Sequence, residues 1–534
     1  MELTPSAHVD TFARDKLPPF DQWPELRFDL PELQYPDRLN CATALLDDVA
    51  AEHGADRPCV MSPTESWTYG ELLARANQVA RVLVEDLGVV PGNRVLLRGP
   101  NNPWLVACWF GVLKAGGVVV TTMPLLRAGE LRTIGEMAQI GLALCDTRFV
   151  DDLAKAGLDS LRTVTYGGGE LDDMAAAKDA TFDDVATAAD DVSLLAFTSG
   201  TTGSPKATMH FHRDVLAIAD TFSKHVLRPT PDDVFTGTPP LAFTFGLGAL
   251  VVFPLRAGAS TLMIEKATPD ELFEHVARHK VTVLSTAPTA YRAILPRLAD
   301  LDVSSLRRCV SAGEALPRPT WEAFHEATGI RIIDGIGATE LLHIFISAAD
   351  DDIRPGSTGR PVPGFTAAVL GPDGQPVPDG EIGRLAVKGP VGCRYLDDPR
   401  QLSYVQNGWN MTGDSFVRDS DGYFWFQARS DDMIISAGYN IAGPEVESAL
   451  MRHDDVMECG VVGAPDEDRG MIVTAFVVLR EGVARSDATV KELQDFVKRE
   501  IAPYKYPRRI TFVDELPRTN TGKLQRFALR ERVS

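Results

Sequence analysis

The sequence is poor in the features that mark secreted, metal-storing or membrane proteins. Its seven cysteines are scattered along 534 residues, and none belongs to a Cys-x-x-Cys pair. This pattern disfavours a disulfide framework and a cysteine metal site, and it favours a reducing, cytoplasmic compartment. The most apolar window, residues 104–120, is interrupted by Lys114 and a glycine pair, so it falls short of a membrane span. Residues 1–19 lack an apolar core and predict no signal peptide.

Positive charge is also in short supply. The chain has 53 Lys and Arg residues against 74 Asp and Glu residues, a formal net charge of −21. This balance argues against nucleic acid or an anionic membrane surface as a partner. It does not exclude an anionic cofactor, because a few local lysines and arginines can still form a positive cleft. A chain of this length predicts two or more domains with large cores.

Alternating helical and apolar segments predict an α/β fold with largely parallel sheets. Expected helices cover residues 71–87, 104–114, 269–279 and 288–299, and expected strands cover residues 94–97, 118–121 and 281–286. Residues 356–426 change to short strands with Gly/Pro turns and predict a β-rich subdomain. The remainder predicts a compact α+β domain, with helices at 444–451 and 489–501 and strands at 459–462 and 472–479.

A segment rich in hydroxyl groups and glycine is the strongest functional signal. Residues 198–206 read Thr-Ser-Gly-Thr-Thr-Gly-Ser-Pro-Lys, between an expected strand at 192–197 and an expected helix at 210–219. Glycines let backbone N–H groups approach a polyphosphate, hydroxyls donate to its oxygens, and the lysine supplies charge. The spacing is not that of a Walker A loop. The alternative is a solvent-exposed turn. The residues concerned are Thr198, Ser199, Gly200, Thr201, Thr202, Gly203 and Lys206.

Two carboxylates stand in patterns that suit a nucleotide. Thr339 and Glu340 follow a glycine-containing segment, residues 335–338, after an expected strand at 330–334, and Glu340 offers a hard oxygen for Mg²⁺. The alternative is a strand-to-helix turn in which Thr339 caps the helix. Asp414 ends a Thr-Gly-Asp triplet, where a carboxylate can accept both hydroxyls of a ribose, although such a triplet is also a common turn.

The order of these segments resembles that of the adenylate-forming superfamily, which includes acyl- and aryl-CoA ligases, luciferases and adenylation domains of peptide synthetases. The segment Arg-Ser-Asp-Asp at 429–432 is similar to the family's hinge, and Pro-Arg-Thr-Asn-Thr-Gly-Lys at 517–523 to its catalytic-lysine segment. The family usually has glycine after the phosphate-loop lysine, whereas this chain has Ala207. The resemblance covers essentially the whole chain.

The resemblance implies a domain organisation and a role for each matched position. A large N-terminal domain at 1–429, with its β-rich subdomain at about 356–429, would be joined through a hinge at 430–432 to a small, mobile lid domain at 433–534. Lys523, Thr339, Glu340 with Mg²⁺ and the hinge Asp431 would serve catalysis. Nucleotide and CoA would be bound by the phosphate-loop residues with Gly313, Glu314, Ala315, Asp334, Gly335, Asp414, Arg429 and Gly438. Asp334 would meet the adenine amine, and Gly438 would line the pantetheine tunnel.

The implied reaction joins a carboxylic acid to CoA at the expense of ATP. The acid first forms an acyl-adenylate with loss of pyrophosphate, and a thiol then displaces AMP. Positioning and charge neutralisation suffice for this chemistry, and the lid must turn about Asp431 between the two steps. The resemblance leaves three alternatives: transfer to a carrier protein, a single half-reaction, or a nucleotide-binding regulator. A monomer or a homodimer is expected.

The acid itself is expected to be aromatic. The run at 239–246 and the residues after Glu340 look like those of benzoate-type ligases, and residues 206–216, 240–248 and 6–15 look most like 2-aminobenzoate-CoA ligases. The pocket would comprise Phe243, Thr244, Phe245, Gly246, Gly337, His343 and Ile344. Aromatic rings would form a flat apolar slot, and Thr244 or His343 would bond an ortho substituent. Benzoate-type ligases usually carry tyrosine where Phe245 stands, so benzoate, 2-aminobenzoate, salicylate and bulkier acids stay open. The alternative is that these aromatics only pack the core.

Overall fold

The computed structural model describes residues 3–199, 205–429, 432–436, 439–466, 469–501, 503–518 and 524–533. The chain forms two compact units, Met1–Ala367 with Val387–Asn410, and Ala368–Ala386 with Met411–Ser534. The predicted hinge at 430–432 stays a prediction, because residues 430 and 431 lie outside the described residues.

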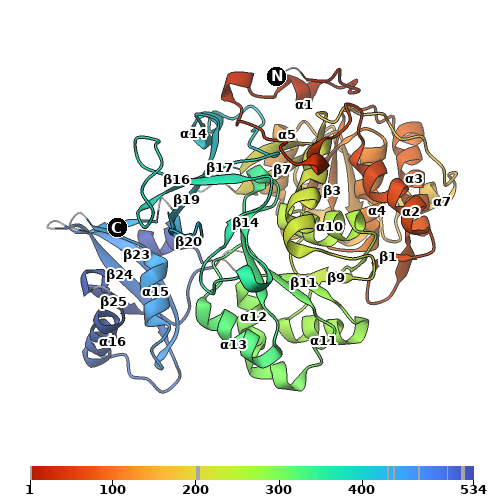
Figure 1. The fold of residues 1–534 in the computed structure, drawn as a ribbon. Helices are drawn as coiled ribbons and strands as arrows, with labels where there is room; N and C mark the ends of the chain where they lie inside the picture. The colour runs from red at the N-terminus through yellow and green to blue at the C-terminus, as the bar shows by residue number, and fades with distance from the viewer. Residues whose placement is uncertain are drawn as a thin grey trace. The chain divides into compact units, whose positions relative to one another are not determined.

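A mostly parallel sheet lies at the centre of the first half of the chain (Figure 1). Its order over the described residues is β6-β5-β3-β4-β7-β8, and only the β7–β8 pair is antiparallel. The strands are β3 (Arg94–Arg98), β4 (Val118–Thr122), β5 (Leu142–Asp146), β6 (Arg162–Tyr166), β7 (Val192–Ser199) and β8 (Pro205–Phe211). The strands expected at 94–97, 118–121 and 192–197 are confirmed. The helix expected at 210 begins instead at His212, because residues 210 and 211 still pair with β7.

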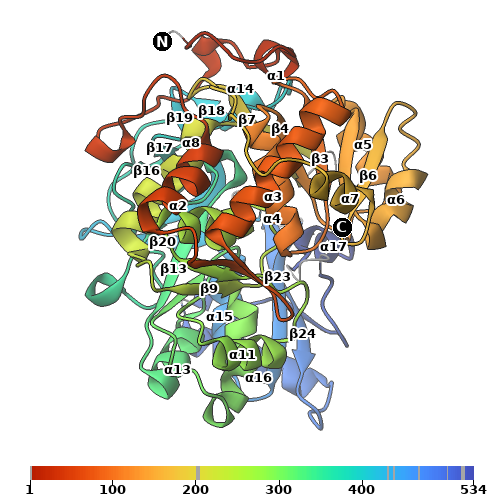
Figure 2. The same cartoon turned by 90° about the vertical axis from the view of Figure 1, so that its right-hand side faces the viewer.

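Two helices, α3 (Tyr69–Arg81), which buries one face, and α4 (Pro103–Lys114), which is almost wholly buried, lie side by side next to this sheet (Figure 2). A capping box between Thr68 and Glu71 starts α3, which satisfies two otherwise unpaired N–H groups of its first turn. The Asn102 side chain caps α4. Around them lie α1 (Phe12–Asp15), α2 (Asp48–His53), α5 (Ala128–Met137), α6 (Val150–Lys155), α7 (Glu170–Ala176), α8 (His212–Ile218), α9 (Thr244–Leu247) and α10 (Phe253–Arg256).

A second sheet of the same unit runs in the order β15-β14-β13-β12-β11-β9-β10-β1-β2 over the described residues. Its strands are β1 (Pro58–Met61), β2 (Ser66–Thr68), β9 (Val234–Gly237), β10 (Ser260–Leu262), β11 (Val283–Thr286), β12 (Arg308–Ser311), β13 (Ile332–Gly337), β14 (Ile344–Ser347) and β15 (Arg360–Pro361). Helices α11 (Pro269–His279), α12 (Pro288–Ile294) and α13 (Arg318–Thr328) pack near β9 and β11 in Figure 1. Their apolar faces, which include Phe273, Tyr291 and Phe324, share one buried core.

Residues 356–426 are rich in strands, as expected. They contain β16 (Thr366–Leu370), β17 (Ile382–Lys388), β18 (Val405–Gln406), β19 (Trp409–Arg418) and β20 (Phe424–Arg429), with one short helix, α14 (Gln401–Tyr404), among the described residues. The three boundaries between the two compact units fall inside β16, β17 and β19.

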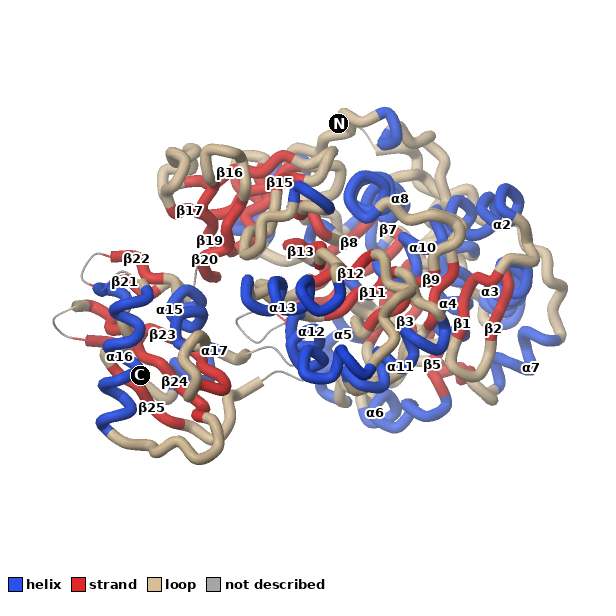
Figure 3. Tube along the Cα trace, turned by 60° about the horizontal axis from the view of Figure 1, so that its bottom comes forward, coloured by secondary structure: helices blue, strands red, loops and turns tan. Residues whose placement is uncertain are grey.

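The C-terminal part has the expected α+β composition. Its sheet runs β22-β21-β24-β23 with β25 on β24, and helices lie against it (Figure 3). The elements are β21 (Ile434–Ser436), β22 (Tyr439–Ile441), α15 (Gly443–Leu450), β23 (Val456–Asp466), β24 (Gly470–Leu479), α16 (Asp487–Glu500), β25 (Arg509–Phe512) and α17 (Arg526–Glu531). Val446, Val473 and Leu493 belong to its core. Among the described residues of the whole chain, no helix is both long and apolar enough to cross a bilayer.

Candidate active site

Lys206 and Glu340 meet although 134 positions separate them in the sequence. Lys206 lies at the start of β8, and Glu340 lies in the short 3-10 turn Thr339–Leu341 that follows β13. The Lys206 Nζ is 2.7 Å from Glu340 Oε1, and the Glu340 side chain is only 8% exposed. The structure therefore brings together the predicted phosphate-binding cation and the predicted magnesium ligand.

The charge on Glu340 is stabilised by its neighbours. Burial acts to raise the pKa of Glu340, but the Lys206 ammonium and hydrogen bonds from Lys206 and Tyr395 outweigh burial, so the pKa lies below its ordinary value. Glu340 is thus a carboxylate at neutral pH. His210 fixes the same turn from β8, because its Nε2 lies 2.8 Å from the Thr339 carbonyl oxygen. His210 was not predicted, and a histidine inside a strand offers no signal in a single sequence.

The phosphate loop is described only at its two ends. Thr198 on β7 pairs in register with Lys206 on β8. The Thr198 hydroxyl is buried and has no hydrogen-bond partner among the described residues, which suits a group that awaits a ligand oxygen. Ser199 ends β7. The predicted Gly200, Thr201, Thr202 and Gly203 lie outside the described residues, as do Asp431, Gly438 and Lys523.

The glycines before Glu340 lie within a strand and not after one. The strand expected at 330–334 extends through Gly337, because β13 continues in antiparallel pairing with β14. A Cβ at Gly335 would come within 2.8 Å of the Ile344 side chain, and one at Gly337 within 2.8 Å of the His343 carbonyl oxygen. Close packing of two strands thus requires these glycines.

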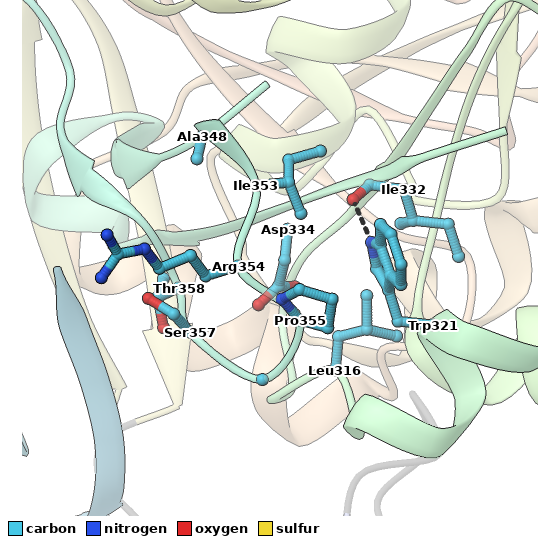
Figure 4. Close-up of a pocket in the computed structure, with 11 residues that line it drawn as sticks. Leu316, Trp321, Ile332, Asp334, Ala348, Ile353, Arg354, Pro355, Ser357 and Thr358 are labelled. Atoms are coloured by element: carbon cyan, nitrogen blue, oxygen red, sulfur yellow. Dashed lines mark hydrogen bonds between the residues drawn. The ribbon is translucent and has the colours of Figure 1, made fainter. Parts of the chain in front are cut away.

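A pocket lies beside Asp334 on the same strand (Figure 4). The Asp334 side chain points into the space between the segment 353–358 and the Trp321 ring, whose Nε1–H donates to the Ile332 carbonyl at 2.9 Å. Burial raises the pKa of Asp334 to about 8. Asp334 Oδ1 and the Ser311 hydroxyl are buried without hydrogen-bond partners among the described residues. Unpaired polar atoms in a pocket are what an adenine amine would satisfy.

The other residues predicted to contact adenine follow β12, which ends at Ser311. Gly313 has a φ of +89°, a backbone conformation that residues with a side chain rarely adopt. Glu314 and Ala315 come next in the same loop before α13.

Asp414 and Arg429 are adjacent within the second compact unit. They face each other in the β19–β20 register, and Arg429 Nη1 donates to Asp414 Oδ1 at 3.1 Å. Gly413 has a φ of +78°, and a Cβ there would come within 2.9 Å of Arg429 Nη2. The predicted ribose-binding pair is therefore assembled by one pair of strands.

The predicted acyl pocket is aromatic and largely buried. The His343 ring centroid lies 5.6 Å from that of Phe245 and 4.5 Å from that of Phe253, and His343 is 3% exposed. Both of its ring nitrogens lack hydrogen-bond partners among the described residues, and burial lowers the pKa of His343 to about 3. The ring is therefore neutral, with one donor nitrogen and one acceptor nitrogen.

The remaining residues of the predicted pocket lie at the beginning of helix α9 and of strand β14. Phe243 precedes α9, and Thr244, Phe245 and Gly246 form its first turn. Ile344 begins β14, is 2% exposed and packs toward Gly335. These positions agree with either a pocket wall or a packed core.

Two residues outside the predicted set of site residues shape this region. Asn101 holds the preceding loop, because its Oδ1 accepts from the Leu241 N–H at 2.9 Å and its Nδ2 donates to the Pro239 carbonyl at 3.0 Å. Gly248 makes room for the histidine, since a Cβ there would come within 2.3 Å of His343 Cδ2. Both act across long sequence separations, which a single sequence does not reveal.

Comparison with known proteins identifies the family. The sequence model of the AMP-binding enzyme family matches residues 46–395, and the sequence model of the AMP-binding enzyme C-terminal domain matches residues 445–523. The chain belongs to the AMP-binding enzyme family. It is 34% identical over 515 residues to the benzoate–CoA ligase of Thauera aromatica, covering 94% of this chain and 97% of that protein.

Solved structures agree with this assignment. An anthranilate CoA ligase in complex with anthranoyl-AMP matches with a TM-score of 0.89 at 34% identity, over 95% of this chain and 99% of that one. A benzoate CoA ligase from Burkholderia xenovorans LB400 matches with a TM-score of 0.84 at 34% identity, over 92% and 100% of the two chains. The fold and the family predicted from the sequence are thereby confirmed, and the protein is an AMP-forming acyl- or aryl-CoA ligase that uses ATP, Mg²⁺ and CoA.

Proposed function

We propose that the enzyme activates 2-aminobenzoate, or a closely similar benzoate, as its adenylate and transfers the acyl group to CoA. The observation that carries the choice of acid is the neutral, buried His343 ring beside Phe245. An uncharged imidazole offers an acceptor nitrogen to an ortho amino group, and the surrounding rings suit a flat aromatic acid. The similar anthranilate and benzoate CoA ligases support this proposal.

The first half-reaction needs charge control more than proton transfer. A carboxylate oxygen of the acid attacks the α-phosphorus of ATP, the bond from that phosphorus to the bridging oxygen breaks, and pyrophosphate leaves. We assign Lys206, with the loop that precedes it, to the departing phosphates, and Lys523 to the reacting carboxylate and α-phosphate. Positive charge aimed at developing negative charge lowers the barrier.

Glu340 suits Mg²⁺ because it is a buried, ionised oxygen donor beside the phosphate-binding lysine. Among the described residues, no three acidic, histidine or cysteine side chains cluster as a metal site. A single carboxylate is nevertheless enough, since Mg²⁺ commonly takes its other ligands from water and phosphate oxygens. When bound, Mg²⁺ neutralises charge on the phosphates.

The nucleotide base and ribose are assigned to separate groups. Asp334 would accept from the adenine amine, and Asp414, oriented by Arg429, would accept from the ribose hydroxyls. In the second half-reaction the CoA sulfur attacks the acyl carbon, the bond from that carbon to the AMP oxygen breaks, and the thiol proton passes to solvent. Asp431 would be the pivot for the accompanying lid movement, and Gly438 would line the path of the CoA thiol.

The test measures AMP and CoA-thioester formation with ATP, Mg²⁺ and CoA across 2-aminobenzoate, benzoate, salicylate and a medium-chain fatty acid. We expect the highest kcat/KM for 2-aminobenzoate. A clear preference for the fatty acid would overturn the pocket assignment. Release of pyrophosphate without a thioester would overturn CoA as the acceptor of this acyl group and favour a carrier protein.

A further inference from the structure

Tyr395 occupies the centre of the Lys206–Glu340 pair, although no motif drew attention to it. It lies between β17 and α14 and is 1% exposed. Its hydroxyl donates to Glu340 Oε1 at 2.5 Å and accepts a hydrogen bond from the Lys206 ammonium. Lys206 Nζ also lies 4.6 Å from the centroid of the Tyr395 ring, within the range of a cation–π contact.

The phenol stays protonated in this position. Burial raises the pKa of Tyr395 well above its ordinary value, and the adjacent Glu340 charge raises it further. A neutral hydroxyl has one proton to donate and lone pairs to accept with. Tyr395 therefore donates to the carboxylate and accepts from the ammonium, and the reverse donation to Lys206 is excluded because an ammonium has no acceptor.

The backbone around Tyr395 is fixed by β8. The Met209 N–H donates to the Arg394 carbonyl at 2.8 Å, and the Leu396 N–H donates to the Ala207 carbonyl at 2.9 Å. The Tyr395 N–H donates to Gln401 Oε1 at 2.9 Å. The segment 394–396 thus runs alongside the strand that carries Lys206, and the ring position is set by main-chain hydrogen bonds.

A buried ion pair secures this segment from the other side. The Arg394 guanidinium donates to Asp214, and both side chains are fully buried. Arg394 also lies over the Phe211 ring, 4.0 Å from its centroid. Removing one partner of such a pair is costly because it leaves an uncompensated buried charge, so this ion pair helps to hold the segment that carries Tyr395.

If Lys206 binds the phosphates and Glu340 binds Mg²⁺, each group gains a new partner and the Lys206–Glu340 contact weakens. Glu340 then depends less on the ammonium for its charge and its orientation. The Tyr395 hydroxyl is the second donor on the same carboxylate oxygen, and the Tyr395 backbone is held by Gln401 and by β8 rather than by the Lys206 side chain.

We propose that Tyr395 is a positioning residue that holds the Glu340 carboxylate ready for Mg²⁺ after Lys206 has moved to the phosphates. This inference rests on the proposed roles of Lys206 and Glu340. Substitution of Tyr395 is expected to weaken the contribution of Mg²⁺ to nucleotide binding and to leave metal-free nucleotide binding almost unchanged.

The experiment measures binding of α,β-methylene-ATP to the full chain by titration calorimetry, once with Mg²⁺ and once with EDTA. The ratio of the two Kd values gives the Mg²⁺ enhancement without turnover. For Tyr395→Phe we expect this ratio to fall about tenfold, the effect of losing one hydrogen bond to a charged group. The Kd in EDTA should change less than about twofold, because that state does not use the carboxylate as a metal ligand.

Tyr291→Phe is the matched control. Tyr291 is fully buried, and its hydroxyl donates to the main-chain carbonyls of Leu284 at 3.2 Å and Val310 at 3.0 Å. It should lower the Tm without changing the Mg²⁺ ratio. An unchanged ratio in Tyr395→Phe, or an equal loss of affinity with and without Mg²⁺, would overturn the positioning role and leave a structural one.

A double-mutant cycle separates this inference from the function on which it rests. In a Glu340→Gln background, Tyr395→Phe should have no further effect on the ratio, because Tyr395 acts through Glu340. A further decrease would overturn the proposed route. If Glu340→Gln keeps the wild-type ratio, the magnesium assignment fails and the inference fails with it. If the ratio changes in Glu340→Gln but not in Tyr395→Phe, the magnesium assignment is supported and the role of Tyr395 is contradicted.

Discussion

Lys206 Nζ lies 2.7 Å from Glu340 Oε1, so the ammonium and the carboxylate neutralise each other. The ammonium is proposed to bind phosphate oxygens, and the carboxylate is proposed to bind Mg²⁺. Because both groups are largely withdrawn from water, neither is stable there without a partner of opposite charge. The pair thereby stabilises both charges within the same buried site.

Lys206→Met should destabilise the protein and abolish adenylate formation. Loss of one partner from a buried pair costs about 3 kcal/mol, and kcat should fall at least about a hundredfold because the phosphates lose a cation. Thermal unfolding and pyrophosphate release measure the two effects. Lys206→Met combined with Glu340→Gln should regain most of the Tm but none of the activity. Failure of the double variant to regain Tm would contradict the account of the uncompensated carboxylate.

The single variant Lys206→Met should also change how the stability of the protein depends on pH. In the wild type the pKa of Glu340 is below its ordinary value of 4.5, so its stabilising contribution is present above that pH and is lost on acidification. Without Lys206, burial alone would raise this pKa, and the variant would lose stability as the pH rises above 4.5. The difference in Tm between wild type and variant should therefore be larger at pH 8 than at pH 5. A constant difference would argue against a role of Lys206 in lowering the pKa of Glu340.

His343→Phe should reduce the preference for 2-aminobenzoate over benzoate by about tenfold, the worth of one hydrogen bond. Competition between the two acids for thioester formation gives this ratio directly. Phe253→Leu is the control, because it changes the packing against His343 without removing a polar group. An equal decrease in thioester formation with both acids would mean that His343 contributes only to packing of the core.

His343 should also contribute to acid denaturation. Its pKa of about 3 lies below the ordinary 6.5, so the unfolded chain binds a proton more readily and stability falls as the pH drops through this range. For such a group, the slope of the free energy of unfolding against pH approaches about 1.4 kcal/mol per pH unit. His343→Phe should flatten the decrease of Tm between pH 6.5 and pH 5, and an unaltered slope would contradict a buried neutral imidazole.

Asp334→Asn should stabilise the protein in mildly alkaline solution. The pKa of Asp334 is raised to about 8 from 3.8, so the folded state retains a proton that the unfolded chain releases, and stability falls as the pH rises between these values. The amide removes this cost, which we expect to be of the order of 2 kcal/mol. Unfolding in denaturant at pH 5 and pH 8.5 should show the gain mainly at pH 8.5. A loss of stability at both pH values would show that hydrogen bonds to the carboxyl group outweigh the cost of its burial.

Asp414→Asn should raise the KM for ATP about tenfold with a smaller change in kcat, because a ribose contact contributes binding that is alike in ground and transition states. Steady-state kinetics at saturating acid and CoA separates the two constants. Thr366→Ala, a substitution in a different strand, is the control and should leave both constants unchanged. A decrease in kcat alone would place Asp414 in the chemical step.

Much of the fold could be predicted because local patterns and spacing carry it. The helices at 269–279 and 104–114 begin where proline or a capping residue dictates, and their bounds were predicted to within one residue. Errors arose where pairing with another strand overrode local preference. The sequence predicts a helix from residue 210 and a strand that ends at residue 334, whereas residues 210–211 extend β8 along β7 and residues 335–337 extend β13 along β14.

The sequence by itself determined the chemical inventory: a hydroxyl- and glycine-rich loop with Lys206, the Glu340 carboxylate, and Asp414 with Arg429, in an order that matches one family. Only the tertiary structure decided which of these groups touch. Tyr395 joins Lys206 and Glu340 across separations of 189 and 55 residues, and His343 is neutral because the packed structure buries it. Such contacts depend on how sheets and loops pack, and burial shifts a pKa only once that packing has excluded water.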